Sequence, residues 1–280
     1  MQDKKIIFSP AKLNIFLKVL GKRNDGYHEI RSGITFLNLF DQITIQHNHK
    51  TIITYSGPFS PSGGFYNNCI IERTLDFLKI KEKVKLKIHI CKNIPVQGGL
   101  GSASSNAASL IIALEEMKLI NHNTPDHYVS LGADIPCFLF KKDCLVAGIG
   151  EKLVHFSFPK YFFLLVKPKF NNSTKDMYKK LRFTDTIVDQ NLISEKIEIN
   201  ENDTGNDFHK IISNESVEYR KIIDYLENIE HSIFVRMTGS GSCCYAVFEK
   251  KEYALKALTL FKSKFSDLWS IVCENNTINN

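Results

Sequence analysis

The sequence predicts an α+β fold arranged in two domains, and three observations support this prediction. Strand patterns come early in the chain and helix patterns follow them, which favours a mixed sheet over a regular alternation of strand and helix. The 280 residues correspond to roughly two domains of ordinary size. A charged segment at 148–152 precedes a new apolar strand at 161–166, so we place the domain boundary near residues 150–160.

The composition is that of an ordinary globular protein. Apolar residues make up 43% of the chain and charged residues 24%, which excludes a disordered, collagenous or fibrous protein. No stretch of about 18 uncharged apolar residues is present, so we expect no membrane span. The 36 basic and 30 acidic residues give a net charge of +6. This small excess fits an anionic substrate but lacks the clustering typical of nucleic-acid binding.

The seven cysteines favour a reducing compartment. They form no C-x-x-C pair, and a zinc site usually needs two such pairs or a Cys/His equivalent. We therefore predict seven reduced, structural thiols, with one member of the vicinal pair Cys243-Cys244 facing the core. The N-terminal residues lack the long apolar core of a signal peptide, so the cytoplasm is the expected location.

Alternating apolar side chains predict the first strands. Residues 12–19 alternate strictly, with one face formed by Leu13, Ile15, Leu17 and Val19 and the other by Lys12, Asn14, Phe16 and Lys18. A polar turn follows at 21–26, and 36–46 gives a further strand. Residues 83–90 alternate again. These segments are expected to form the sheet of the first domain.

Later segments supply helices and further strands. Residues 104–118 carry an apolar stripe at helical spacing, formed by Ala107, Leu110, Ile111, Leu114 and Met117. Residues 161–166, 233–237 and 243–248 are expected to be strands, with a loop at 238–242. Residues 253–265 have helical periodicity, with Leu255, Leu258 and Phe261 spaced by three. The polar stretch 181–230 predicts no definite element.

A glycine- and serine-rich segment at 94–108 predicts a phosphate-binding loop. Glycines at 98, 99 and 101 allow positive φ and a close approach of the backbone to a ligand. The predicted helix begins directly afterwards, and its free N–H groups and dipole favour an anion. Hydroxyls at 102, 104 and 105 can donate to phosphate or hold a metal ion. The segment matches neither the P-loop nor the dinucleotide pattern, and a bare glycine turn capped by serine is the alternative.

Three further sites carry polar residues with a possible common purpose. Lys12 and Asn14 share the polar face of the first strand, and taken alone that face would be expected in solvent. Asp134, between small and apolar residues, would alone be a turn or cap residue. Tyr27-His28 after a glycine turn would ordinarily be a half-buried aromatic and an exposed imidazole. Phosphoryl transfer would give these residues a common function. It needs a cation, a carboxylate beside the acceptor hydroxyl and groups that bind the acceptor, and the lysine, the aspartate and the Tyr-His pair could supply them.

The chain resembles the GHMP kinase superfamily through three motifs in the family's order. They are Ser9-Pro-Ala-Lys-Leu-Asn-Ile-Phe-Leu17, the Pro95…Gly98-Gly-Leu-Gly-Ser-Ala-Ser-Ser105 loop and Met237-Thr-Gly-Ser-Gly-Ser-Cys243. The resemblance covers nearly the whole chain. It implies an ATP-binding domain at 1–155, similar to domain 2 of ribosomal protein S5, and a ferredoxin-like α/β domain at 156–280, with the active site in the cleft between them.

Further stretches narrow the resemblance to one kind of kinase within the superfamily. They are Pro10-Ala-Lys-Leu-Asn14, Asp25-Gly-Tyr-His-Glu29, Ser104-Ser-Asn-Ala-Ala108, Leu131-Gly-Ala-Asp-Ile-Pro136, Gly148-Ile-Gly-Glu151 and Asn206-Asp207-Phe208. The resemblance implies ATP- and Mg²⁺-dependent phosphorylation of the 2-hydroxyl of methylerythritol linked to cytidine diphosphate, in the non-mevalonate route to isoprenoid precursors. It implies a small-molecule substrate, no nucleic acid or membrane partner, and a monomer or weak homodimer.

The same resemblance implies roles for individual residues. Lys12 and Asp134 would be the catalytic pair, with Asp134 as the base or the anchor of the hydroxyl. Tyr27 and His28 would bind the cytosine. The other substrate-binding residues would be Asn14, Tyr178, Gly239 and Gly241. The ATP-binding residues would be Pro95, Val96, Gln97, Gly98, Gly99, Leu100, Gly101, Ser102, Ala103, Ser104 and Ser105, with Asn68 and Lys92 lining the nucleotide site. No residue is assigned as a metal ligand.

One departure from the family pattern and two alternative functions bear on this assignment. Gln97, Ser102 and Ala103 stand where this kind of kinase usually has glycines, and their Cβ atoms would narrow the loop. A different small-molecule kinase, acting for example on mevalonate or homoserine, is the first alternative, but a small acid acceptor needs no base-stacking Tyr27-His28 pair. A non-catalytic nucleotide- or RNA-binding module is the second, and the presence of both Lys12 and Asp134 and the lack of a basic stripe argue against it.

Overall fold

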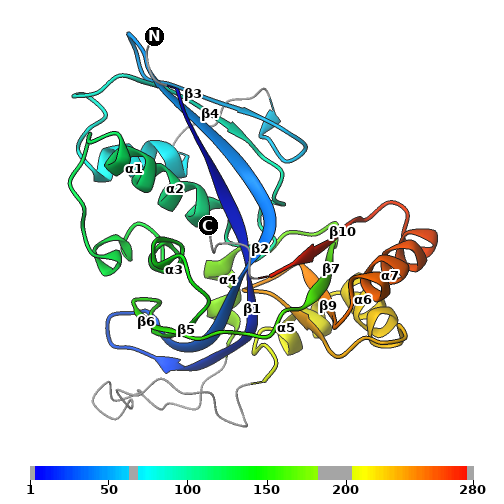
Figure 1. Ribbon diagram of the computed structural model, residues 1–280. Helices are drawn as coiled ribbons and strands as arrows, with labels where there is room; N and C mark the ends of the chain where they lie inside the picture. The colour runs from blue at the N-terminus through cyan, green and yellow to red at the C-terminus, as the bar shows by residue number, and fades with distance from the viewer. Residues whose placement is uncertain (1–3, 63–68, 182–203, 276–280) are drawn as a thin grey trace. The chain divides into compact units, whose positions relative to one another are not determined.

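The computed structural model describes residues 4–62, 69–181 and 204–275 (Figure 1). The strands are β1 (Lys5–Lys22), β2 (His28–His47), β3 (Ile52–Ser56), β4 (Leu86–Cys91), β5 (Cys144–Gly148), β6 (Lys152–His155), β7 (Phe162–Lys167), β8 (Val235–Met237), β9 (Cys244–Phe248) and β10 (Trp269–Glu274). The α-helices are α1 (Ile70–Phe77), α2 (Ser102–Glu116), α3 (Ile135–Phe140), α4 (Thr174–Lys180), α5 (His209–Glu215), α6 (Val217–Glu227) and α7 (Lys251–Lys264). This content confirms the predicted α+β class.

The described residues form two compact units, each built from separate stretches of the chain. Unit 1 comprises the chain up to Ala11, Leu39–Val96 and Gly101–Lys141, as far as they are described. Unit 2 comprises Lys12–Asn38, Gln97–Leu100 and the described part of the chain from Lys142 onward. β1 and β2 therefore each contribute residues to both units. The sequence-based division at residue 155 stays a prediction, because packing units need not be continuous in sequence.

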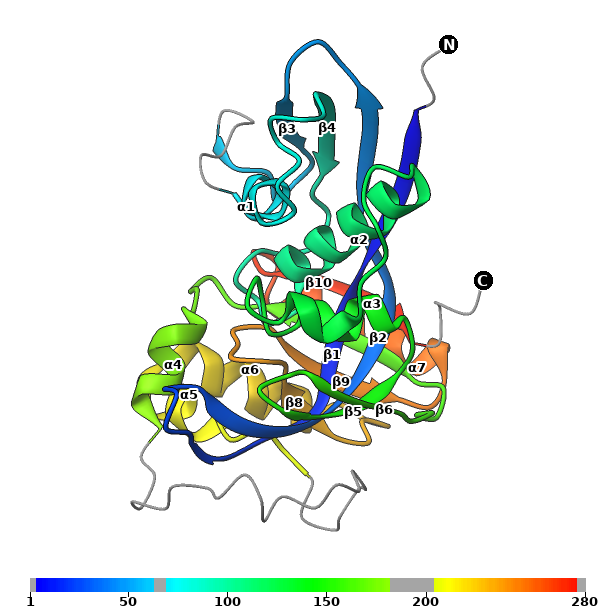
Figure 2. The ribbon, with the colours of Figure 1, turned by 90° about the vertical axis from the view of Figure 1, so that its left-hand side faces the viewer.

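Unit 1 holds β3, β4 and parts of β1 and β2, together with helices α1, α2 and α3. β4 pairs in parallel with β3 and antiparallel with residues 42–47 of β2. α1 and α2 lie on one side of these strands (Figures 1 and 2), where their apolar residues join a common core with Ile88 and Ile90 of β4. The strand alternation and the helix stripe predicted for this part of the chain are thus confirmed, with α2 starting two residues earlier than expected.

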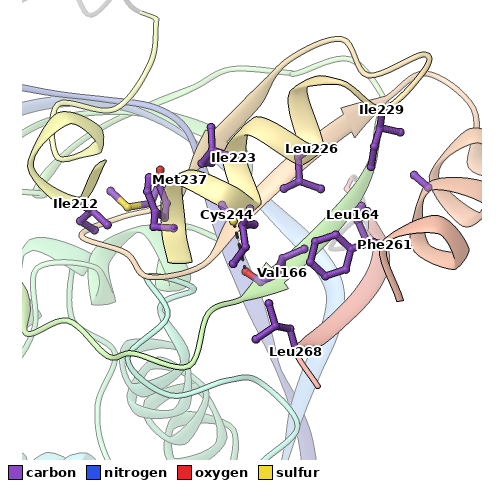
Figure 3. Packing of buried hydrophobic residues seen from close by; sticks show 14 of the residues in the cluster. Leu164, Val166, Ile212, Ile223, Leu226, Ile229, Met237, Cys244, Phe261 and Leu268 are labelled. Atoms are coloured by element: carbon purple, nitrogen blue, oxygen red, sulfur yellow. Dashed lines mark hydrogen bonds between the residues drawn. The ribbon is translucent and has the colours of Figure 1, made fainter. Parts of the chain in front are cut away.

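Unit 2 contains an antiparallel sheet in the order β10-β7-β9-β8. α6 and α7 place apolar side chains on it, and Figure 3 shows Leu226 and Phe261 pointing toward Leu164 of β7. In the same unit, residues 30–34 of β2 pair antiparallel with β5, which pairs with β6. The strands expected at 161–166, 233–237 and 243–248 are confirmed as β7, β8 and β9.

The apolar stripe predicted for the C-terminal helix is wrong in part. α7 buries Ala254, Ala257 and Phe261, while Leu255 is 45% exposed and Leu258 is partly buried. The buried face is therefore set by two alanines, which let the helix approach the sheet closely. In the polar stretch without a predicted element, α5 and α6 form, and α6 buries four apolar or aromatic residues of unit 2, namely Tyr219, Ile222, Ile223 and Leu226.

All seven cysteines are free thiols, as predicted. Cys243 and Cys244 are both fully buried, so the expectation that one of them faces the core understates their burial. Burial raises the pKa of the Cys243 thiol to about 12, which keeps it protonated and unreactive at neutral pH. Among the described residues, no helix combines the length and apolar character needed to cross a bilayer.

Candidate active site

The glycine segment of the predicted phosphate loop runs beside the C-terminal glycine motif in unit 2. The amide of Cys243 donates to the carbonyl of Gly98 (3.1 Å), and the hydroxyl of Thr238 donates to the carbonyl of Gly99 (3.2 Å). A Cβ atom on Gly99 would lie 2.1 Å from the carbonyl oxygen of Thr238. A Cβ on Gly239 would lie 2.9 Å from the carbonyl oxygen of Gly99. Glycine is therefore required at both contacts by lack of space.

Left-handed backbone conformations shape the loop. Gly99 and Gly101 have φ of +75° and +70°, and Gln97 has φ of +52°. Because glycine adopts positive φ without a Cβ clash, glutamine at position 97 is more strained than a glycine would be. Gly101 is also the N-cap of α2 and no side chain caps this helix. The first-turn N–H groups of α2 are thus left for another acceptor.

The three predicted loop hydroxyls have different environments in unit 1. Ser102 is buried and donates to Asp41 (3.0 Å), and Ser105 is buried and donates to the carbonyl of Pro10 (2.6 Å). Ser104 is half-buried, and no hydrogen bond of its hydroxyl is found among the described residues. Ser104 is therefore the hydroxyl best placed to serve a ligand.

The other predicted nucleotide residues differ in exposure. Pro95 is buried, whereas Val96 and Ala103 are exposed. Leu100 is buried and its carbonyl accepts the amide of Lys12 (3.0 Å). Asn68 lies outside the described residues.

Lys92 is a buried cation of unit 1. Its ammonium donates to Asp41, to Ser102 and to Asn106 Oδ1, the last at 2.8 Å. Burial lowers the pKa of Lys92, and the neighbouring Asp41 carboxylate opposes this shift.

Lys12 and Asn14 are buried in unit 2, so the expectation that their face of β1 lies in solvent is wrong. Their exposed fractions are 2% and 4%. The Lys12 ammonium donates to Asn14 Oδ1, and Asn14 Nδ2 donates to the hydroxyl of Ser32 (2.8 Å). The amide of Asn14 donates to the hydroxyl of Thr238 (3.1 Å). Asn14 therefore orients the lysine and links the first motif to the third.

The Asn206-Asp207-Phe208 tripeptide binds three parts of unit 2. Asn206 Nδ2 donates to the carbonyls of Met237 and Gly239, at 2.9 and 2.8 Å. Asp207 accepts from the amide of Val19 (2.8 Å) in β1, and also from a lysine of the same strand. The Phe208 ring packs edge-on against an aromatic ring of α4. The C-terminal glycine motif is thus held by an amide side chain from another segment. Within that motif, Gly241 has φ of +85° and no room for a Cβ.

The predicted base-binding aromatics are partly brought together. The His28 ring lies against Tyr178, with centroids 4.8 Å apart and an interplanar angle of 33°. Tyr178 in turn meets Phe208 edge-on at 4.9 Å. Tyr27 is 50% exposed while His28 is half-buried, the reverse of the ordinary expectation for this pair. Burial lowers the pKa of His28 from its usual 6.5, and Lys22 adds to the effect.

Asp134 belongs to unit 1 and stands at the N-terminal boundary of α3. Its side chain makes no capping hydrogen bond with this helix, and its backbone is helical rather than extended. Asp134 thus lies in a turn and at the cap position, as its local sequence alone suggests, but its side chain does not cap the helix. The pairing of Asp134 with Lys12, which lies in unit 2, stays a prediction.

Several contributors to the site are absent from the sequence-based residue set. Thr238 lies inside the recognised C-terminal motif, and Asn206 and Phe208 lie inside the recognised Asn-Asp stretch, so these motifs could have indicated them. Ser32 and Asp41 carry no local signal, because both are single polar residues within a strand.

Comparison with known proteins places this geometry in a family. The chain matches "GHMP kinases N terminal domain" over residues 68–142 and "GHMP kinases C terminal" over residues 189–267. The chain belongs to the GHMP kinases.

The similarity extends to one group within that class. A 4-diphosphocytidyl-2-C-methyl-D-erythritol kinase of Francisella tularensis subsp. holarctica is 35% identical over 94% of both chains. The kinase of that name from Prochlorococcus marinus is 33% identical over 96% of both. A crystal structure of 4-(cytidine 5'-diphospho)-2C-methyl-D-erythritol kinase has the same fold, with a TM-score of 0.74 at 23% identity, covering 96% of this chain and 99% of that one. Within the GHMP kinases, the chain belongs to the 4-diphosphocytidyl-2-C-methyl-D-erythritol kinase family.

Proposed function

We propose that this chain is an ATP-dependent kinase that phosphorylates the 2-hydroxyl of 4-diphosphocytidyl-2-C-methyl-D-erythritol, a step of the non-mevalonate isoprenoid route. The relatives that share 33–35% of their residues with it carry this kinase's name. The observation that carries the proposal is the meeting of three motifs in unit 2: Asn14 contacts Thr238, which contacts Gly99. A cation, a glycine loop and a second glycine motif are thereby assembled on one scaffold.

The nucleotide phosphates would be bound mainly by backbone amides. The uncapped N-terminus of α2 and the left-handed residues before it present N–H groups suited to an anion. The described residues contain no cluster of three His, Cys, Asp or Glu side chains. A magnesium ion that is held chiefly by phosphate oxygens and water needs no such cluster. The Ser104 hydroxyl is the protein group that would be available to it. Bound there, magnesium would neutralise phosphate charge.

Transfer would use Asp134 and Lys12. Asp134 takes or holds the proton of the acceptor's 2-hydroxyl while that oxygen attacks the γ-phosphorus, and ADP leaves. The Lys12 ammonium, fixed by Asn14, offsets the negative charge that develops on the transferred group. The buried position of Lys12 strengthens this interaction because water does not screen it.

The cytosine would be bound by the aromatic residues around His28. A neutral imidazole offers one donor and one acceptor to the edge of the base, and Tyr27 offers an exposed ring for stacking. The Tyr178 ring, which lies against this imidazole, is the second aromatic residue assigned to the base. This arrangement separates the proposal from a mevalonate or homoserine kinase, whose acceptor has no base.

Replacing His28 by alanine is expected to raise the KM for the cytidine substrate about tenfold, with a smaller change in kcat, because a base contact is lost away from the reacting oxygen. Steady-state kinetics with each substrate varied would measure it. His231→Ala is the matched control, since His231 also stacks on a tyrosine, Tyr253, but lies outside the predicted site. Equal KM values for the His28 variant and the control would contradict the cytosine role.

Substrate affinity is expected to fall as the pH drops below 6.5. Burial lowers the pKa of His28 in the folded protein below that value, so the imidazole becomes charged only at a still lower pH, where it loses the ring nitrogen that accepts a hydrogen bond from the base. Above pH 6.5 the imidazole is neutral and KM should be constant. A pH series of KM for the cytidine substrate, on the wild type and His28→Ala, checks this. The acidic rise should be present only in the wild type; a rise of the same size in the variant would assign it to another group.

An assay of ATP consumption tests the function itself. Purified protein would be supplied with 4-diphosphocytidyl-2-C-methyl-D-erythritol, mevalonate, homoserine or galactose. We expect turnover with the first acceptor and competition by cytidine nucleotides. Turnover with mevalonate or homoserine and none with the cytidine substrate would replace the proposal by the first alternative. ATP binding without any turnover would favour a non-catalytic module.

A further inference from the structure

A fully buried carboxylate, Asp41 of β2, anchors the chain just before the phosphate loop. Its Oδ1 atom accepts the backbone amides of Asn93 (2.7 Å) and Ile94 (2.9 Å). These two residues follow the end of β4 after one intervening residue and directly precede the loop residues 95–105. The side-chain amide of Asn93 also donates to the carbonyl of Phe40 (3.0 Å), next to Asp41. One oxygen of Asp41 thus fixes the backbone at the entry to the loop.

The other oxygen of Asp41 binds the end of the loop, where α2 begins. Its Oδ2 atom accepts from the Ser102 hydroxyl and from Asn106 Nδ2, both at 3.0 Å, and from the Lys92 ammonium. Ser102 and Asn106 lie in the first two turns of α2, four residues apart and so on one face of the helix. Asp41 therefore receives five donors: two amides at the entry of the loop, the Ser102 and Asn106 side chains at its end, and the lysine.

The donors of Lys92 are fully used inside this cluster. An ammonium has three N–H groups, and Lys92 has three acceptors: Asp41, Ser102 and Asn106. The one hydroxyl hydrogen of Ser102 goes to Asp41. All four residues are buried, and none is more than 7% exposed. Neither Lys92 nor Ser102 has a donor left for a nucleotide while the cluster is intact.

We propose that Asp41 is a positioning residue for ATP binding, and that Lys92 and Ser102 act on the nucleotide through it by holding the phosphate loop in shape. The carboxylate keeps the entry of the loop and the first turns of α2 in register, so that the backbone amides converge on the phosphates. The inference rests on the proposed use of this loop for ATP. It also explains what Ser102 does in place of the usual glycine, because its hydroxyl bridges the lysine and the carboxylate.

The alternative is that Lys92 itself contacts ATP. It predicts the opposite effect of an Asp41 variant on ATP affinity, so one measurement can distinguish the two. If Lys92 contacted ATP itself, neutralising its partner in Asp41→Asn would release the ammonium and leave ATP affinity unchanged or stronger. If Asp41 positions the loop, the same variant weakens ATP binding, because Asn supplies only one acceptor oxygen where two are used. Calorimetric titration of ATP, with no acceptor present, measures the dissociation constant. This readout does not depend on which molecule is phosphorylated, so it separates this inference from the proposed substrate.

We expect Asp41→Asn to raise the dissociation constant for ATP about tenfold or more. Asp143→Asn is the matched control, a half-buried carboxyl that accepts from Thr35 and the amide of Phe36, and it should leave ATP affinity within about twofold of the wild type. The double variant Asp41→Asn/Lys92→Met removes both charges, so no unpaired ion is left in the core, and the asparagine oxygen can still accept the amides of Asn93 and Ile94. It should unfold at a higher temperature than Asp41→Asn but should not regain the ATP affinity of the wild type. Recovery of both properties in the double variant, or unchanged ATP affinity in Asp41→Asn, would overturn the proposal.

Discussion

Replacing Asp134 by asparagine is expected to lower kcat by about 100- to 10,000-fold, the usual contribution of a general base. Asparagine keeps the size of the side chain but cannot take a proton or hold the acceptor hydroxyl as an anion does. The affinity for ATP should change little, since the loop and the α2 N-terminus are untouched. Single-turnover kinetics with 4-diphosphocytidyl-2-C-methyl-D-erythritol would measure the chemical step, and calorimetry would measure ATP binding.

A double variant tests whether Asp134 and Lys12 act as a catalytic pair. If Asp134 and Lys12 act together, Lys12→Met/Asp134→Asn should be no slower than the slower of the two single variants, because groups that act as a unit are not additive. Asp126 is an exposed acid in the short 3-10 helix Pro125–Tyr128, and Asp126→Asn serves as the control that should retain full turnover. Full turnover in Asp134→Asn would remove this residue from the mechanism.

Replacing Gly99 by alanine is expected to weaken ATP binding about tenfold or more and to destabilise the fold by about 2 kcal/mol. The added Cβ would lie 2.1 Å from the carbonyl oxygen of Thr238, so the loop or the C-terminal motif must move. The positive φ of +75° adds backbone strain for alanine. Urea unfolding and calorimetric ATP titration measure the two effects, and Gly99→Val should exceed alanine in both.

The variant Gly205→Ala separates the effect of backbone strain from the effect of steric crowding by the added Cβ atom. Gly205 has nearly the same φ, +76°, but a Cβ there would meet nothing within 4 Å. Its variant should show the stability loss caused by strain alone and should leave ATP affinity intact. If the Gly99 and Gly205 variants bind ATP equally well, the contact between Gly99 and Thr238 has no bearing on the nucleotide.

Local patterns predicted the elements of this fold more reliably than the environment of its polar residues. The alternation in β1 indicated the strand but placed Lys12 and Asn14 in solvent, whereas both are buried. Their burial depends on Ser32 and Thr238, which lie 18 and 224 positions from Asn14 along the chain. Hydrogen-bond partners at such separations leave no trace in a short window of sequence, so only Thr238, which lies inside the recognised C-terminal motif, could have been indicated.

The two errors of detail have similar origins. The face of α7 was assigned from its leucines, but tertiary packing selects Ala254 and Ala257, because a small residue allows the helix to approach the sheet. Asp41 was missed because one acid in an apolar strand looks like many others. Its significance comes from Asn93, Ile94 and α2, which the fold brings to it.

The Asn206-Asp207-Phe208 tripeptide has a consequence for how such chains can diverge. Each of its three residues contacts a different part of the fold: Asn206 binds the C-terminal glycine motif, Asp207 binds β1, and Phe208 packs against the Tyr178 ring. A one-residue insertion or deletion within it would misalign at least one of these attachments and could not be compensated by a conservative exchange of side chains. We therefore expect the insertions and deletions that the fold tolerates in this part of the chain to lie outside residues 206–208.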